Sequence, residues 1–279
     1  MSLDFRQVLF CPPTYFKVVD VKNPFMERAA PVDTARAHQQ WEKVCAAFAA
    51  AGLETQAIGA VEGLEDMVFA ANQTFVGADS TGNKFVVPSR MRHPSRRREV
   101  AHYVQWFRER GFETVELGLG DNDFLEGGGD LLWQSPTLIW AGHGFRSSPA
   151  GVRKFAEAMK ARGLRTVPLE LTDPRFYHLD TCLAPLREDS VLIYPGAFSQ
   201  SALHSIQLHC ARVHTVPEDE ALAFTCNGVS AAGKFITGRL TPGLAAALKA
   251  EDLEPVLVDT SEFEKSGGSV CCLKMFVPT

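Results

Sequence analysis

The hydrophobic and polar positions of this chain follow two patterns that alternate along its length. Between residues 33 and 51, apolar side chains recur every three or four residues and Gly52 follows, which predicts a helix that ends there. Similar spacing predicts helices over 96–110, 150–162, 199–211 and 242–250. Short apolar runs predict strands at 7–10, 84–87, 113–117, 137–141, 166–170, 191–194 and 254–258. Strands separated by helices indicate an α/β protein.

Composition and charge narrow the class of protein. The 279 residues are 46% hydrophobic and carry a formal net charge of −5, which suits a folded chain and disfavours a nucleic-acid binder. No run approaches the roughly 20 apolar residues that span a bilayer. The first residues lack a basic region followed by an apolar one, so we expect a cytoplasmic protein. No linker or low-complexity segment appears, which favours one domain over 1–279.

Seven cysteines are spread along the chain without the spacing of a zinc site. Without a secretory signal, a disulfide framework is not expected. Most of the cysteines are therefore expected to be small buried hydrophobic residues, and at least one is a candidate nucleophile. The dense basic cluster 90–98 is interpreted as a solvated helix start for most of its arginines.

Three segments combine polar residues with glycine or histidine. Leu125 to Asp130 places two carboxylates around three glycines, so backbone could approach a ligand closely, although an exposed acidic turn is the commoner explanation for such a segment alone. His178 and Asp180 would project to one side of an extended segment, where the carboxylate would suit the imidazole for proton transfer. A structural histidine is the alternative interpretation. Residues 265–275 lead through a glycine pair into a short apolar strand with Cys271 and Cys272, either buried thiols or a nucleophile.

Glu, His and Cys in this order, within several longer motifs, resemble the guanidino-group-modifying superfamily. That superfamily includes dimethylarginine dimethylaminohydrolases, arginine deiminases and amidinotransferases, and the pattern is most similar to bacterial arginine dihydrolases and dimethylargininase-like proteins. The motifs span nearly the whole chain, which makes the set more specific than any one of them. They are residues 9–13, 23–26, 66–72, 125–130, 142–146, 176–181, 194–198 and 267–273.

The resemblance implies a five-bladed, pseudo-symmetric α/β propeller, the pentein fold. Five units in 279 residues would be roughly 56 residues each, although no sequence repeat is visible. It also implies that Cys272 is the nucleophile, His178 the general acid and base, and Glu126 the carboxylate that holds the guanidinium. Counting from the second glycine instead of from Lys265 would select Cys271.

Further residues of the family's substrate site match this chain. The resemblance assigns Asp66 and Asp180 to the guanidino nitrogens. Asn72 matches the asparagine of dihydrolases, where deiminases and dimethylargininases have Asp; an amide can hold a neutral ureido group as well as a guanidinium. The remaining matches are Arg90 and Arg146 for the substrate α-carboxylate and Asn23 for its α-amino end.

The leading hypothesis is a cysteine hydrolase of free arginine or a related guanidino compound, acting through a covalent amidino-thioether without metal or organic cofactor. The alternatives are a dimethylarginine dimethylaminohydrolase, an amidinotransferase, and a non-catalytic propeller that binds a ligand. Four residues depart from the dihydrolase pattern and leave another guanidino substrate open: Lys22, Phe25, Glu65 and Lys274. A homodimer is compatible with the sequence, and neither nucleic acid nor membrane is expected as a partner.

Overall fold

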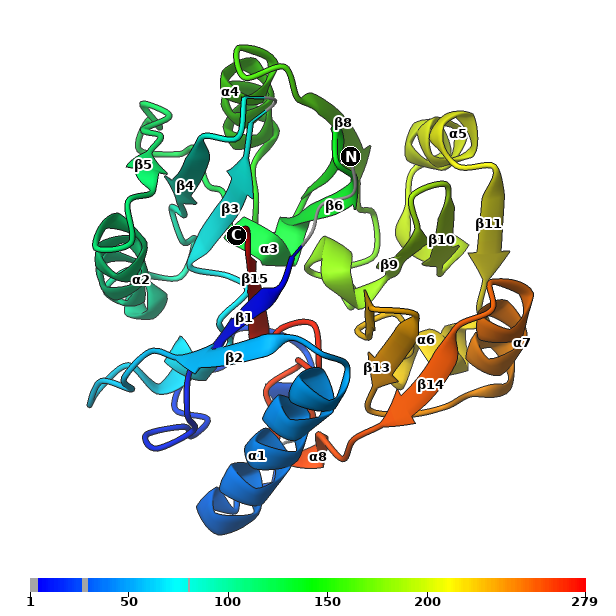
Figure 1. Cartoon of the computed structure of the whole chain (residues 1–279), viewed down its shortest axis with the longest axis horizontal. Coiled ribbons are helices and arrows are strands. Elements are labelled where there is room, and N and C mark those ends of the chain that lie inside the picture. Colours follow the sequence, from blue (N-terminus) through cyan, green and yellow to red (C-terminus); the bar gives the residue numbers. More distant parts are fainter. Residues whose placement is uncertain (1–4, 27–29, 80) are drawn as a thin grey trace.

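The strands of this protein form five three-stranded sheets arranged as blades around a central axis (Figure 1). The structure is a computed structural model that describes residues 5–26, 30–79 and 81–279. Residues 1–4 lie outside the described residues. The expectation that the chain lacks a secretory leader rests partly on them. The five sheets confirm the five-bladed α/β propeller that the family resemblance implied.

Each blade repeats one arrangement, in which an inner strand pairs antiparallel with a middle strand and the middle strand pairs parallel with an outer one. The inner strands are β15 (Lys274–Val277), β3 (Thr74–Ala78), β6 (Leu131–Ser135), β9 (Leu183–Arg187) and β12 (Val229–Ala231). The middle strands are β1 (Gln7–Phe10), β4 (Lys84–Pro88), β7 (Leu138–His143), β10 (Ser190–Ile193) and β13 (Lys234–Thr237). The outer strands are β2 (Glu54–Ala57), β5 (Glu113–Thr114), β8 (Arg165–Glu170), β11 (Arg212–Thr215) and β14 (Glu254–Leu257).

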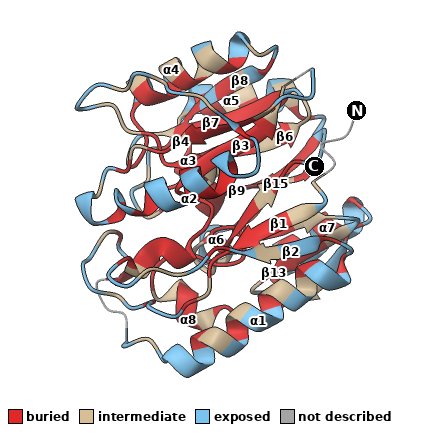
Figure 2. Ribbon diagram, turned by 60° about the vertical axis from the view of Figure 1, so that its left-hand side comes forward, coloured by how far each residue is buried: buried red, intermediate tan, exposed pale blue. Residues whose placement is uncertain are grey.

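A helix connects the middle strand of each blade to the outer strand and covers the outside of the ring. These helices are α1 (Thr34–Ala50), α2 (Glu99–Arg108), α4 (Pro149–Lys160), α5 (Gln200–His209) and α7 (Pro242–Ala250). A parallel pair needs such a crossover, which explains why helices alternate with strands in the sequence. Figure 2 shows the exposed faces of the helices on the outside and buried residues along the strands.

The first blade contains both an early and a late part of the chain. Strand β1 pairs with β15 antiparallel, with Gln7 opposite Val277, and with β2 in parallel. The inner strand of this blade therefore comes from residues more than 260 positions away in the sequence, and its pairing closes the ring.

The predicted helices are confirmed within a few residues, as are the predicted strands apart from β5, which is shorter. Helix α2 begins at Glu99 rather than at residue 96, because Pro94–Arg96 forms a separate 3-10 turn. Two local predictions are wrong. Cys271 and Cys272 lie in a turn that precedes β15, not on the strand, and Leu179–Thr181 is a 3-10 turn rather than an extended segment.

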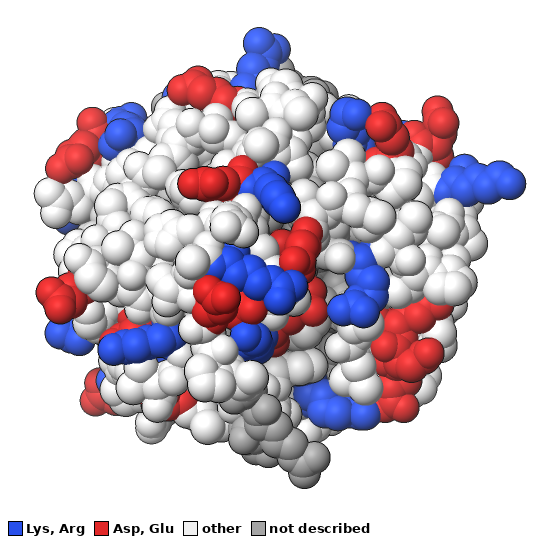
Figure 3. All heavy atoms as spheres, turned by 90° about the horizontal axis from the view of Figure 1, so that it is seen from below, with Lys and Arg blue, Asp and Glu red and all other residues white. Residues whose placement is uncertain are grey.

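The surface agrees with the charge balance of the sequence. On the face shown in Figure 3, acidic and basic side chains lie next to one another rather than in one broad area of a single sign. Within the described ranges, no helix has the length and apolar character needed to cross a bilayer.

Candidate active site

Four of the candidate site residues lie in the segments that precede the inner strands. Asn72 comes just before β3, Glu126 before β6, His178 before β9 and Cys272 before β15. Because the inner strands surround the axis in equivalent positions, the segments that lead into them meet at one end of the ring. Residues far apart in the sequence are thereby brought together without any single blade containing the site.

A small cavity lies where these segments meet. Its lining mixes cationic, anionic and amide groups with a thiol and a few apolar side chains. The lining residues are Lys22, Asn23, Met26, Asp66, Phe69, Asn72, Arg96, Arg146, Tyr177, His178, Ser266, Gly268 and Cys272.

Geometry separates the two adjacent cysteines. Cys272 lines this cavity, whereas Cys271 lines a different cavity on the axis. The Cys272 thiol donates to Asp180 Oδ2 at 3.0 Å and receives a hydrogen bond from Asn227 Nδ2 at 3.3 Å. Burial, reinforced by the Asp180 charge, raises the pKa of Cys272 well above its usual value. Without a bound cation the sulfur is therefore held as a thiol.

The orientation of the His178 imidazole is fixed by Glu126. The imidazole Nε2 lies 2.8 Å from Glu126 Oε2, and Arg146 donates to the same oxygen at 2.9 Å. Burial alone would raise the pKa of Glu126, but the Arg146 charge and the His178 hydrogen bond together lower it well below its usual range. Glu126 is fully buried and is not among the residues that line the cavity. Its carboxylate contacts the side chains of His178 and Arg146, which do line it.

Asp66 lines the cavity from the 3-10 turn Glu65–Val68, and a cation already contacts it. Lys22 Nζ lies 2.9 Å from Asp66 Oδ2 and also pairs with Asp20. The Lys22 side chain is only 5% exposed. Its ammonium thus neutralises Asp66 through Oδ2, while Oδ1 of the same carboxylate has no partner among the described residues.

Arg96 is a cavity residue that the sequence interpretation missed. Its guanidinium donates to Asn72 Oδ1 at 3.0 Å and to the Asp66 carbonyl at 3.1 Å, and it pairs with the buried Glu99. Because Arg96 can only donate, it fixes which end of the Asn72 amide is the oxygen. The composition of the basic cluster does not indicate which of its arginines is buried. The one feature that could have pointed to Arg96 is Glu99, three residues later, because side chains at this spacing on a helix can pair.

The two arginines assigned to the substrate carboxylate lie in different places. Arg146 lines the cavity, with its guanidinium 4.7 Å from the centre of the Tyr177 ring. Arg90 does not line it: its guanidinium donates to the Leu119 carbonyl and pairs with Asp121. Asn23 lines the cavity and donates to the Ser266 carbonyl at 2.9 Å.

The glycines at 127–129 allow close packing within the protein rather than approach to a ligand. A Cβ on Gly127 would lie 2.5 Å from the Thr74 carbonyl oxygen, and one on Gly129 would lie 2.4 Å from Asn72 Nδ2. Asp130, at the end of this segment, accepts from the Leu179 amide at 3.1 Å. The segment therefore locks the Asn72 and His178 segments together.

Besides the Ser266 hydroxyl, three buried polar atoms near the cavity have no hydrogen-bond partner within the described part of the chain: Asp66 Oδ1, Asp180 Oδ1 and Asn72 Nδ2. Buried polar groups normally have partners, so these atoms indicate where a polar ligand would bind. Two are acceptors and one is a donor. Among the described residues, no group of three or more His, Cys, Asp or Glu side chains is arranged to hold a metal ion.

Comparison with known proteins agrees with this geometry. Residues 74–223 match the arginine deiminase family model. The chain is 37% identical to an N(G),N(G)-dimethylarginine dimethylaminohydrolase of Mycobacterium tuberculosis, over 96% of this chain and 84% of that protein. It is 33% identical to the bifunctional arginine dihydrolase/ornithine cyclodeaminase AgrE of Nostoc, over 96% of this chain but only 37% of that longer protein.

Among solved structures, the N-terminal domain of the cyanobacterial arginine dihydrolase ArgZ superposes with a TM-score of 0.89 at 32% identity, covering 96% of this chain and 97% of that one. The fold and these relatives define a pentein of the guanidino-modifying type. The chain belongs to the superfamily of arginine deiminases, arginine dihydrolases and dimethylarginine dimethylaminohydrolases.

Proposed function

We propose that the chain is one catalytic domain that hydrolyses the guanidino group of free arginine, with Cys272 as nucleophile. The observation that carries the proposal is the set of three unpartnered atoms beside the thiol. A guanidinium is a planar cation that has only donors, and Asp66 Oδ1 and Asp180 Oδ1 are free acceptors. We assign the carboxylate and amino ends of the substrate to Arg146 and Asn23, because both residues line the cavity.

The chemistry begins with a change of charge in the cavity. A guanidinium that displaces Lys22 from Asp66 brings a delocalised cation next to Cys272, which favours the thiolate. The thiol already donates to Asp180, so that carboxylate is the acceptor for its proton. The thiolate then attacks the guanidino carbon, and His178 donates a proton to the departing nitrogen, which leaves as ammonia.

The second half of the reaction releases the product. The covalent amidino-thioether is attacked by a water molecule whose proton passes to His178, and the C–S bond breaks to regenerate the thiolate. The product is the ureido compound citrulline. Glu126, which bonds His178 Nε2, acts as the positioning group that keeps the imidazole oriented through both steps.

Asn72 supports a second round of hydrolysis. Arg96 fixes its amide so that Nδ2 is the unpartnered donor. A guanidinium cannot accept a hydrogen bond, but the ureido oxygen of citrulline can. The donor therefore fits a citrulline that remains bound and is hydrolysed further to ornithine, ammonia and carbon dioxide.

The proposed activity depends on a free Cys272 thiol, which a reducing compartment preserves. We therefore place the enzyme in the cytoplasm. The second candidate activity is hydrolysis of dimethylarginine to citrulline and dimethylamine, favoured by the 37% identity to the mycobacterial protein of that name.

The test is to incubate the purified protein with L-arginine and quantify products and ammonia by mass spectrometry and an ammonia assay. We expect ornithine and two ammonias per arginine, with no turnover by Cys272→Ser and substantial turnover by the matched Cys271→Ser. A Cys272→Ser protein with full activity overturns the assignment. Dimethylamine from dimethylarginine without ammonia from arginine replaces the proposal with the second candidate, and a new guanidino compound formed in the presence of glycine indicates amidino transfer.

Asn72→Asp separates the two rounds of hydrolysis. The carboxylate cannot donate to a ureido oxygen, so we expect citrulline to accumulate and ornithine to fall by at least about tenfold, the loss of one or two hydrogen bonds. The citrulline-to-ornithine ratio measures this directly. An unchanged ratio would refute the proposed role of Asn72.

A further inference from the structure

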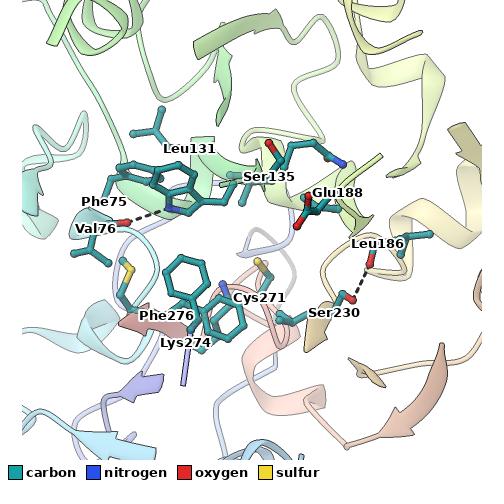
Figure 4. Close-up of a pocket in the computed structure, with 18 of the residues that line it drawn as sticks. Phe75, Val76, Leu131, Ser135, Leu186, Glu188, Ser230, Cys271, Lys274 and Phe276 are labelled. Atoms are coloured by element: carbon teal, nitrogen blue, oxygen red, sulfur yellow. Dashed lines mark hydrogen bonds between the residues drawn. The ribbon is translucent and has the colours of Figure 1, made fainter. Parts of the chain in front are cut away.

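A second cavity, of about 280 Å³, lies on the propeller axis, on the other side of the turn that contains Cys271 and Cys272 (Figure 4). Each of the five inner strands contributes residues to its wall. Cys271 lies at its base, and the next residue, Cys272, lines the active site. The turn that contains these two cysteines therefore lies between the two cavities.

The wall of this axial cavity is largely apolar and aromatic. The Phe75 and Trp133 rings stack with centroids 5.2 Å apart, and both residues line the cavity, as does Phe276. Its volume is close to the lower end of the roughly 300–1,000 Å³ found for small-molecule pockets, so it suits a compact ligand.

Apart from Glu188, which is exposed at the edge, the polar side chains of the wall are satisfied within the protein, with one exception. Gln134 donates to the Arg187 carbonyl, Ser230 to the Leu186 carbonyl and the Trp133 indole to the Val76 carbonyl. The Arg187 guanidinium is directed at the Glu251 and Asp252 carbonyls.

Lys274 is the exception. The residue is only 9% exposed, and its ammonium lies 4.8 Å from the centre of the Phe276 ring and beside the Cys271 thiol. No ion pair joins it to a carboxylate among the described residues, although its charge reaches the buried Asp180, where burial raises the pKa of the carboxyl and the Lys274 charge lowers it. A buried ammonium in an apolar wall is costly unless an anion neutralises it. The sequence departs from the dihydrolase pattern at this same position.

The shape and charge together select a class of ligand. One ammonium can neutralise one negative charge, and the exposed Glu188 at the edge of the cavity disfavours a dianion. Aromatic walls favour an aromatic body. We propose that the axial cavity binds a small aromatic monocarboxylate, with its carboxylate on Lys274 and its ring among Phe75, Trp133 and Phe276. This site is distinct from the active site and does not depend on the proposed function.

The test uses 3-phenylpropionate as the probe and the neutral 3-phenylpropanamide as its matched control, with binding followed by calorimetry and by ligand-observed NMR. We expect the acid to bind at least tenfold more tightly than the amide. Lys274→Met should remove that preference, whereas Lys234→Met, at a half-buried lysine that pairs with Glu254 and does not line the cavity, and Cys272→Ser, in the active site, should leave it intact.

A second variant keeps the test independent of the stability of Lys274→Met. Ser135→Trp retains the ammonium but fills the mouth of the cavity, so it should weaken binding of the acid at least tenfold. Equal affinity for acid and amide overturns the proposal. Binding that persists in both Lys274→Met and Ser135→Trp, or that is lost in Cys272→Ser, overturns it as well.

Discussion

Individual residues show that charge inside the active site is balanced by the protein itself before any ligand arrives. Lys22 neutralises Asp66, Arg146 neutralises Glu126, and Arg96 pairs with Glu99. Buried charges are costly without such partners. We therefore expect a cationic substrate to compete with Lys22 for Asp66.

Lys22→Met tests this exchange. The apolar side chain removes the competing cation but retains the backbone contacts of residue 22, so we expect KM for arginine to fall by about threefold to tenfold, or about 0.7–1.4 kcal/mol, with kcat little changed. Steady-state kinetics measure both constants. Lys17→Met, which removes an exposed lysine near Glu65, is the matched control and should leave KM unchanged. A raised KM in Lys22→Met would show that Lys22 aids binding instead.

Asp180 makes stability depend on pH in a direction opposite to that of an ordinary carboxylate. Burial raises its pKa from 3.8 to about 6, against the hydrogen bonds from Cys272 and Asn227. Between those values the folded protein binds the proton more readily than the unfolded chain, so this group's contribution to stability falls as pH rises through about 4 to 6, by roughly 3 kcal/mol in total.

Asp180→Asn removes that titration. We expect the unfolding free energy of the variant relative to the parent protein to increase from pH 4.5 to pH 7.5, as measured by urea unfolding at several pH values. Asp219→Asn, at an exposed position, is the control and should show no such trend. A relative stability that stays constant across the range would mean that Asp180 titrates alike in the folded and unfolded chain.

The structural elements explain what the sequence could and could not predict. The ring helices and four of the five middle strands have clear patterns and were predicted, as was β14, whereas β2 is a short, mostly exposed strand without an apolar run and was missed. Inner strand β3 is buried on both faces and lacks the alternation that marks a strand. The motifs located most of the cavity residues, but Arg90 and Arg96 could not be told apart, because only the 3-10 turn at Pro94–Arg96 directs one of them inward.

The short helix α3 (Gly127–Asp130) offers a test of packing at the element scale. In Gly129→Ala the added Cβ would lie 2.4 Å from Asn72 Nδ2 and 3.1 Å from the His178 ring, so both residues must shift. We expect a loss of about 1–3 kcal/mol in unfolding free energy and at least a tenfold fall in kcat. Gly59→Ala, where nothing lies within 4 Å of the added atom, should change neither. Normal activity in Gly129→Ala would show that the site tolerates movement of these side chains.

The whole molecule is a ring whose closure depends on pairing rather than on chain continuity. Gln7 and Val277 are directly opposite each other in the β1–β15 pair, so a short linker can join these two regions. The turn at Ala232 and Gly233, between β12 and β13, is a suitable place for new ends, because both residues have positive φ in a tight surface turn.

A circular permutant that joins the original ends through a flexible linker and begins at Gly233 should therefore fold and act on the same substrate. We expect kcat within about threefold of the parent protein and a Tm lower by only a few degrees, since every sheet keeps its hydrogen bonds. Thermal unfolding and kinetics measure these. A permutant that does not fold would indicate that the β12–β13 connection is needed to build the last two blades.

The location of the site residues in the segments that lead into the inner strands also bears on how such proteins diverge. The sheets, which hold the ring together, and the reactive groups, which choose the substrate, are in different parts of each repeat. Mutations in the leading segments can alter chemistry while the hydrogen-bonded framework is inherited unchanged. Substrate preference among guanidino compounds can therefore change through successive substitutions in these segments, while each intermediate protein still folds.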